Sequence, residues 1–144
     1  MGITIEFKNG ELEAVHGFLT GIKLQGSASR ARTALCKEVA RKYTELCEAR
    51  TEVQREFGEL DEEGDLVADK EGVMAFESEE KRLGCIEEVD KLMGETAVVD
   101  CIELAEKIGV LLSALNGLEE GLAGEEATIY DLICTQLEKA VQER

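Results

Sequence analysis

Residues 27–57 read SASRARTALCKEVARKYTELCEARTEVQREF and decide the fold that we expect. The stretch contains no Pro and no Gly, so nothing in it interrupts a helix. Its apolar residues recur at spacings of three and four, with Ala49 at the one weak step: Leu35, Val39, Tyr43, Leu46, Val53 and Phe57. This spacing predicts one long amphipathic helix. Ser27 or Ser29 is its expected N-cap, and Gly58 is expected to end it.

The same stretch concentrates positive charge in a strongly acidic protein. The 144-residue chain has 16 basic and 32 acidic residues, for a formal net charge of −16. Residues 23–42 contain one acid, Glu38, among six basic residues: Lys23, Arg30, Arg32, Lys37, Arg41 and Lys42. Charge divided in this way steers a charged partner or aligns copies of the chain head to tail. The alternative is a solvated helix face, on which Glu38 pairs with Lys42.

Composition restricts both the fold and the class of function. Hydrophobic residues make up 44% of the chain, aromatic residues only 4%, and Pro and Trp are absent. We therefore expect an aliphatic core in a single mainly α-helical domain, residues 1–144, built as a bundle of about five helices with a small β element. The net negative charge disfavours nucleic acid and anionic membranes, and it favours a basic or nucleic-acid-binding protein as partner.

The cysteines and the N-terminal residues indicate a location. Five cysteines without a Cys-Xaa-Xaa-Cys spacing argue against a disulfide framework and favour a reducing compartment. The first ten residues, MGITIEFKNG, lack the basic and apolar regions of a secretory signal. No apolar run approaches the roughly 18 residues that span a bilayer. A cytoplasmic protein is expected.

Two short strands are predicted beside the helices. Ile3, Ile5 and Phe7 alternate with polar residues, which is typical of a strand with one apolar face over residues 3–7. Residues 96–99 read TAVV and form a second β-favouring segment. We expect these two strands to pair with each other.

Four further helices are predicted, over residues 11–22, from Ser78 to Gly94, from Asp100 to about 116 and from about Glu125 onward. Ser78 is expected to cap the second of these, and Asp100 with Glu103 to form a capping box for the third. The residues expected to face inward are, in chain order, Leu12, Val15, Phe18, Leu19, Ile22, Leu83, Ile86, Val89, Leu92 or Met93, Leu104, Ile108, Leu111, Leu112, Leu115, Ile129, Leu132, Ile133, Leu137 and Val141.

An acidic segment, GELDEEGDLVADKEGVMAF, follows the long helix. Residues 66–76 are predicted either as two short strands joined by a turn at 69–72 or as an ordered acidic loop. We find no internal repeat. A calcium-binding loop that begins at Asp61 would need Gly at its sixth position, where Leu66 stands, so a solvated turn is favoured over a metal site.

No catalytic signature is found. Cys36 and Cys47 lie three helical turns apart, but the chain has only one His, His16, and no zinc-binding spacing. A cysteine nucleophile with His16 as its base would need an orienting group and an oxyanion site that nothing in the sequence indicates. Glycine-rich phosphate loops are also absent. We expect neither catalytic residues, nor a metal, nor a cofactor.

The order of these segments resembles a family of short, acidic, uncharacterised bacteriophage proteins. The resemblance rests on GSASRARTALCKEVARKYTELCEAR at 26–50, LDEEGDLV at 60–67 and VVDCIELAEKIGVLLSALNGLEE at 98–120. That family pairs a SRART-like helix start with a KDExG-like turn and a VDI-like segment, from which this chain departs at Cys101. The resemblance implies a phage or prophage origin, a non-enzymatic role and the cytoplasm of a bacterial host.

The leading functional interpretation is a phage-associated protein that binds other proteins during virion assembly or infection, and that self-associates or docks to a charged partner. The alternative is an acidic nucleic-acid mimic that inhibits a host defence nuclease, as anti-CRISPR proteins do. A thiol or metal enzyme is the third hypothesis. The candidate partner-binding residues are Arg30, Arg32, Lys37, Arg41, Asp61, Glu62, Glu63 and Asp65.

Overall fold

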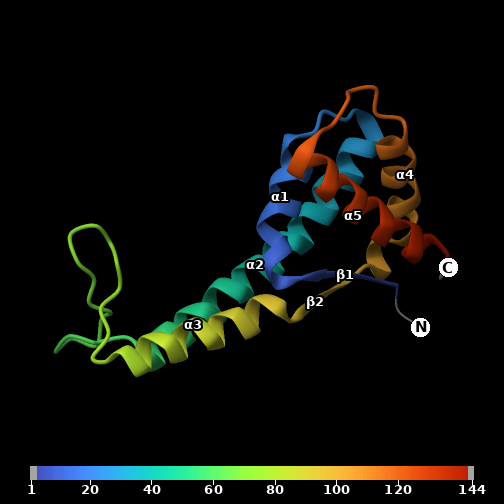
Figure 1. Ribbon diagram of the computed structural model, residues 1–144. Helices are drawn as coiled ribbons and strands as arrows, with labels where there is room; N and C mark the ends of the chain where they lie inside the picture. Colours follow the sequence, from blue (N-terminus) through green and yellow to red (C-terminus); the bar gives the residue numbers. More distant parts are fainter. Residues whose placement is uncertain (1–2, 143–144) are drawn as a thin grey trace. The chain divides into compact units, whose positions relative to one another are not determined.

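The computed structural model describes residues 3–142, which form five α-helices and one two-stranded antiparallel sheet (Figure 1). The elements are β1 (Thr4–Lys8), the 3-10 helix η1 (Asn9–Glu11), α1 (Leu12–Gly21), α2 (Gly26–Phe57), α3 (Glu79–Gly94), β2 (Thr96–Asp100), the 3-10 helix η2 (Ile102–Leu104), α4 (Ala105–Asn116) and α5 (Gly124–Gln142). The predicted mainly α fold with a small β element is confirmed.

The chain divides into two compact units. The first unit combines the described residues up to Tyr43 with those from Thr96 onward, and the second unit is Thr44–Glu95. The helix α2 contributes to both, since its residues 26–43 belong to the first unit and its residues 44–57 to the second.

The sheet holds the two separate parts of the first unit together. β1 and β2 pair with Ile5 opposite Val99 and Phe7 opposite Ala97, as the sequence predicts. These four side chains are buried on one face, while the residues between them point to the exposed face. In Figure 1, α1, α4 and α5 gather over this sheet, and α5 contacts α1, α4 and β1.

The core of the first unit is aliphatic, as the composition predicts. Its fully buried large side chains are Ile5, Leu12, Val15, Leu19, Val39, Val99, Leu111, Leu115, Ile133 and Leu137. Val141, expected to face inward, is 36% exposed, and the buried position next to it is Ala140. The 3.6-residue period alone does not distinguish these neighbours, and here the smaller side chain faces the core.

Two of the predicted helix starts differ in the structure. Because α2 begins at Gly26, neither Ser27 nor Ser29 is its N-cap. The capping box expected at Asp100 and Glu103 is not formed either, because η2 precedes α4 and Asp100 Oδ1 accepts the Ile102 amide, at 3.0 Å. Both differences lie at a helix end, where several local hydrogen-bonding arrangements compete.

The start of α3 is predicted correctly. The Ser78 hydroxyl accepts a hydrogen bond from the Lys81 amide, at 3.2 Å, and therefore caps the helix. Glu79 and Glu80 place negative charge in the first turn, where the helix dipole favours it. The helix ends at Gly94, also as expected.

The buried stripe predicted for α3 is wrong at two positions. Leu83 is 53% exposed and Ile86 is 45% exposed, whereas Cys85 is buried. The reason lies at Gly84, where a Cβ atom would stand 2.7 Å from Cε1 of Phe57. Since only glycine permits this approach, the Phe57 ring packs against the backbone of α3, and Leu83 and Ile86 are turned to solvent.

We predict that Gly84→Ala lowers the free energy of unfolding by about 1–3 kcal/mol, because the new methyl group overlaps the Phe57 ring. Urea denaturation followed by circular dichroism measures this change. Gly94→Ala is the matched control, because no atom lies within 4 Å of its Cβ position. In the double variant Phe57→Leu/Gly84→Ala, the smaller side chain should recover part of the loss. Equal stability of the two single variants would contradict the proposed packing.

Candidate functional site

Residues 59–76 contain the same turn twice, although no internal repeat was predicted. Asp61-Glu-Glu-Gly64 and Asp69-Lys-Glu-Gly72 lie eight residues apart, and each glycine has a positive φ, of 85° and 83°. In both turns the aspartate Oδ1 accepts two backbone amides, at distances between 2.9 and 3.0 Å. The aspartate closes the turn and the glycine supplies the left-handed conformation that it requires.

Backbone hydrogen bonds order the whole acidic segment. The Val67 amide donates to the Glu59 carbonyl, the Ala75 amide to the Val67 carbonyl and the Glu59 amide to the Ala75 carbonyl, each at 2.9 Å. The predicted turn at 69–72 is confirmed, although residues 66–76 form isolated β-bridges rather than continuous strands. The segment is therefore a small hydrogen-bonded tip of the second unit.

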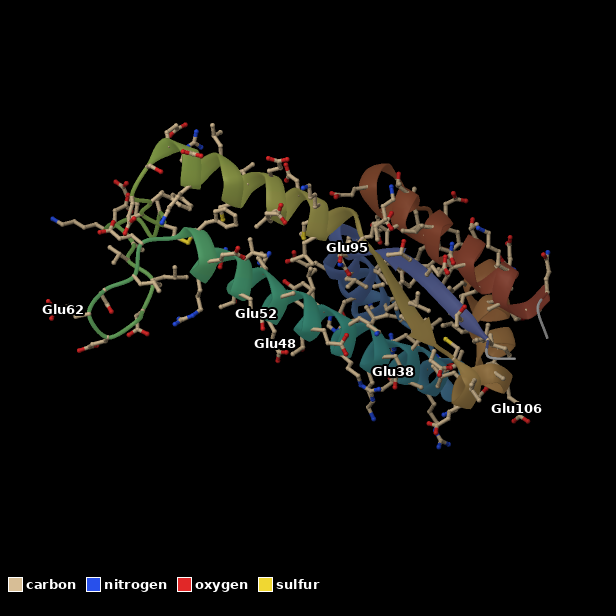
Figure 2. All side chains as sticks on the ribbon, turned by 90° about the horizontal axis from the view of Figure 1, so that it is seen from below. Glu38, Glu48, Glu52, Glu62, Glu95 and Glu106 are labelled. Atoms are coloured by element: carbon tan, nitrogen blue, oxygen red, sulfur yellow. The ribbon has the colours of Figure 1, made fainter. Side chains whose placement is uncertain are left out.

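The acidic candidate residues meet at the first of these turns. Asp61, Glu63 and Asp65 each bring one carboxylate oxygen within 4.8 Å of the others, and all three side chains are exposed. Asp61 already accepts the amides of Glu63 and Asp65, so it serves the turn itself. Glu62 is exposed and lies at the tip in Figure 2. Exposed carboxylates of this kind are typical of a solvated turn.

The basic candidate residues divide into one internal and three surface side chains. The half-buried guanidinium of Arg32 donates from Nη1 to the carbonyls of Leu19 and Ile22, at 3.0 and 2.6 Å. Arg32 therefore ties α2 to the C-terminal end of α1, whose last carbonyls need donors. Arg30, Lys37 and Arg41 are exposed.

Glu38 lies in the same part of α2 as the exposed cations Arg30, Lys37 and Arg41. Its carboxylate pairs with Arg41 at 3.1 Å, one helical turn away. Arg41 therefore compensates the negative charge of Glu38, the one acid of the basic stretch. This ion pair does not involve Arg30 or Lys37.

Negative charge is concentrated in the second unit. Residues 44–95 contain 18 acidic and 6 basic side chains, a formal charge of −12 out of the −16 of the whole chain. Figure 2 shows Glu48 and Glu52 on the side of α2 turned away from α3. The mimicry hypothesis names Glu59, the acids of the tip and those of the helix from Ser78 to Met93, and the exposed acids of residues 44–57 extend this acidic surface along α2.

Exposed apolar side chains accompany this charge. Four of the eight exposed large hydrophobic side chains among the described residues belong to the second unit, and they are between 42% and 61% exposed: Leu60, Val73, Leu83 and Ile86. The helical spacing of apolar residues predicts Leu83 and Ile86 in the core, so it does not reveal them as surface residues. The contact of Gly84 with Phe57 turns Leu83 and Ile86 outward. The spacing of apolar residues within one helix does not predict a contact with another helix.

The four buried cysteines are free thiols in surroundings that suppress their reactivity: Cys36, Cys85, Cys101 and Cys134. Burial raises the pKa of Cys101 to about 11, and the nearby carboxylate of Asp100 adds to the effect. Burial also raises the pKa of Cys85, that of Cys134 and, against the opposing charge of Arg32, that of Cys36. A nucleophilic thiol needs the opposite shift.

The remaining thiol, Cys47, and the single histidine are the other groups named in the thiol-enzyme hypothesis. Cys47 is half-buried and lies 3.9 Å from Nη2 of Arg50. Among residues 3–142, no hydrogen bond joins the ring of His16 to a thiol.

Comparison with protein-family models, with curated protein sequences and with solved structures finds no match. No helix within the described part of the chain combines the length and the apolar character that crossing a membrane requires.

We predict that Arg32→Met costs about 2 kcal/mol of folding stability, because two charge-assisted hydrogen bonds to α1 are lost. Arg30→Met removes the same charge from an exposed position of the same helix and should change stability by less than about 0.5 kcal/mol. Urea unfolding of both variants provides the comparison. If both are as stable as the parent protein, Arg32 does not hold α1.

Thiol labelling tests the cysteine environments. At pH 8, iodoacetamide should modify Cys47 roughly tenfold or more faster than Cys101, which is buried and carries a raised pKa. Mass spectrometry of the digested protein gives the rate at each site. In urea the two rates should converge. Equal rates in the folded protein would show that Cys101 is accessible after all.

Proposed function

We propose that this chain is a non-enzymatic, phage-associated protein that acts by binding other proteins, in an accessory role in virion assembly or infection within the host cytoplasm. The observation that carries the binding role is the formal charge of −12 on residues 44–95. A field of this sign attracts basic proteins and repels phosphate backbones. The phage setting rests on the sequence resemblance alone.

Apolar surface supports the same role. Leu83 and Ile86 lie one turn apart on α3 and are exposed among acidic neighbours such as Glu79, Glu87 and Asp90. Apolar contacts surrounded by a charged rim are a common arrangement in protein interfaces, because the charges steer the encounter and the apolar contacts hold the complex. We therefore propose that the second unit carries the principal contact with a basic or nucleic-acid-binding protein.

Self-association is a further part of the proposal. The exposed cations Arg30, Lys37 and Arg41 belong to the first unit, whereas the second unit is acidic. Copies of the chain would attract one another where these surfaces meet, and the overall charge of −16 would oppose it. Sedimentation at low and high salt distinguishes the two. If attraction between the opposite surfaces dominates, self-association decreases as salt is added, because salt screens that attraction. If repulsion between the net charges dominates, self-association increases instead.

Charge reversal in the second unit tests the binding role. In phage-producing bacteria, the tagged protein is crosslinked to its partners, and each purified partner is then titrated with the variants. Glu48→Lys/Glu52→Lys/Glu62→Lys should lower the affinity roughly tenfold or more, and added salt should weaken what remains.

The matched control reverses three exposed acids of the first unit, Glu13, Glu106 and Glu120. Both triple variants change the net charge equally, so only the location of the charge differs between them. Equal loss of affinity would assign the effect to net charge, and unchanged affinity in both would remove the acidic unit from the interface.

A nucleic-acid mimic that inhibits a host defence nuclease is the second candidate. The observation that favours it is the run of exposed carboxylates along the second unit, including Glu48, Glu52 and Glu62. Such carboxylates would occupy a basic channel that normally holds phosphates. Cleavage assays with purified RNA-guided nucleases test this candidate. Inhibition by the parent protein and by the first-unit control, but not by the second-unit variant, would support mimicry. Undiminished cleavage by every nuclease tested would exclude mimicry for those enzymes.

A further inference from the structure

We propose that the first unit contains a separate site for a compact polyanion, such as a phosphorylated or polycarboxylate small molecule. The site is a groove of about 370 Å³ between α2 and the beginning of α4. It lies entirely within the first unit and does not depend on the protein-binding role proposed above.

Three unpaired cations converge on this groove. Arg30 and Lys37 come from α2 and Lys107 from the first turn of α4, so two separate elements supply them. All three are exposed, and none forms an ion pair with another described residue. In a chain with 32 acids and 16 bases, uncompensated positive charge gathered at one concave place indicates an external anion as its partner.

The one acid at the groove does not cancel this charge. Glu38 lines the groove, but its carboxylate is paired with Arg41 at 3.1 Å. Arg41 therefore compensates Glu38, and the charge of the three converging cations stays available to a ligand.

The end of a helix adds partial charge of the same sign. Leu104 is the N-cap residue of α4 and also lines the groove, and α4 begins without a side-chain cap. The macrodipole of this 12-residue helix places partial positive charge at its N-terminus, which the carboxylate of Glu106 in the first turn offsets in part. The cations and the helix end thus act on the same groove, and an anion there would benefit from both.

The size and the polarity of the groove define the ligand class. Its volume is within the range of small-molecule sites, and the hydroxyls of Ser29 and Thr33 add hydrogen-bonding groups to its wall. Phosphoryl and carboxylate groups are the anions that lysine and arginine bind through charge-assisted hydrogen bonds. A long polyanion is disfavoured, because the remaining surface of a −16 protein repels it.

Isothermal titration calorimetry at low salt tests the proposal, with inorganic phosphate, pyrophosphate and citrate as probes. Pyrophosphate or citrate should bind with one-to-one stoichiometry and more tightly than phosphate, because each presents more charge to the three cations. The ratio of pyrophosphate to citrate affinity distinguishes a phosphoryl from a carboxylate ligand. Absence of measurable binding by all three at millimolar concentration overturns the site.

Matched variants locate the binding. Lys37→Met/Lys107→Met should lower the affinity for the tighter probe roughly tenfold or more, since two of the three cations are lost. Lys8→Met/Lys139→Met removes the same charge from exposed lysines outside the groove and should leave the affinity unchanged. Circular dichroism verifies that both variants are folded.

Two results would contradict the assignment. If both double variants lose affinity equally, the probes respond to overall charge and not to the groove. If a single-stranded oligonucleotide binds more tightly than pyrophosphate and its binding depends on Lys37 and Lys107, the ligand is a polymer and the compact class is wrong.

Discussion

The pairing of β1 with β2 is the constraint on which the first unit depends. It joins residues 4–8 to residues 96–100, and α5 packs against β1, α1 and α4. Between the two strands the chain runs through Thr44–Glu95, which forms a compact unit of its own. In chain order, the second unit is thus an insertion into the first.

The two units differ in how much hydrophobic core and how much net charge each contains. Among the described residues, the first unit contains all the fully buried large side chains, and it accounts for only a small part of the net charge. In the second, Leu46 and Cys85 are the buried hydrophobic residues among those described, and exposed carboxylates predominate. Self-repulsion among like charges opposes compaction, so it is tolerated where little of the core is formed. That separation leaves the acidic surface free to meet a partner without loss of the main core.

The sequence predicts those features that depend on a period or on a single local rule. The long helix, each of the two strands and the cap at Ser78 follow from patterns within a few residues, and the β-favouring character of both strands led us to expect that they pair. What it could not predict depends on contacts between elements. The outward turn of Leu83 follows from Gly84 meeting Phe57, and the hydrogen bonds of Arg32 follow from the place where α1 ends. The spacing of apolar residues predicts neither contact.

The duplicated turn bears on how this segment can change in evolution. Each copy closes through its own aspartate and its own left-handed glycine, within five residues, and the hydrogen bonds repeat in the same frame eight residues later. A copy gained or lost as a whole would preserve the alternation that pairs one strand segment with the next. Related chains should therefore differ in length here by steps of eight residues, whereas insertions of other sizes would break the register. The tip is modular in a way that no other part of the described chain is.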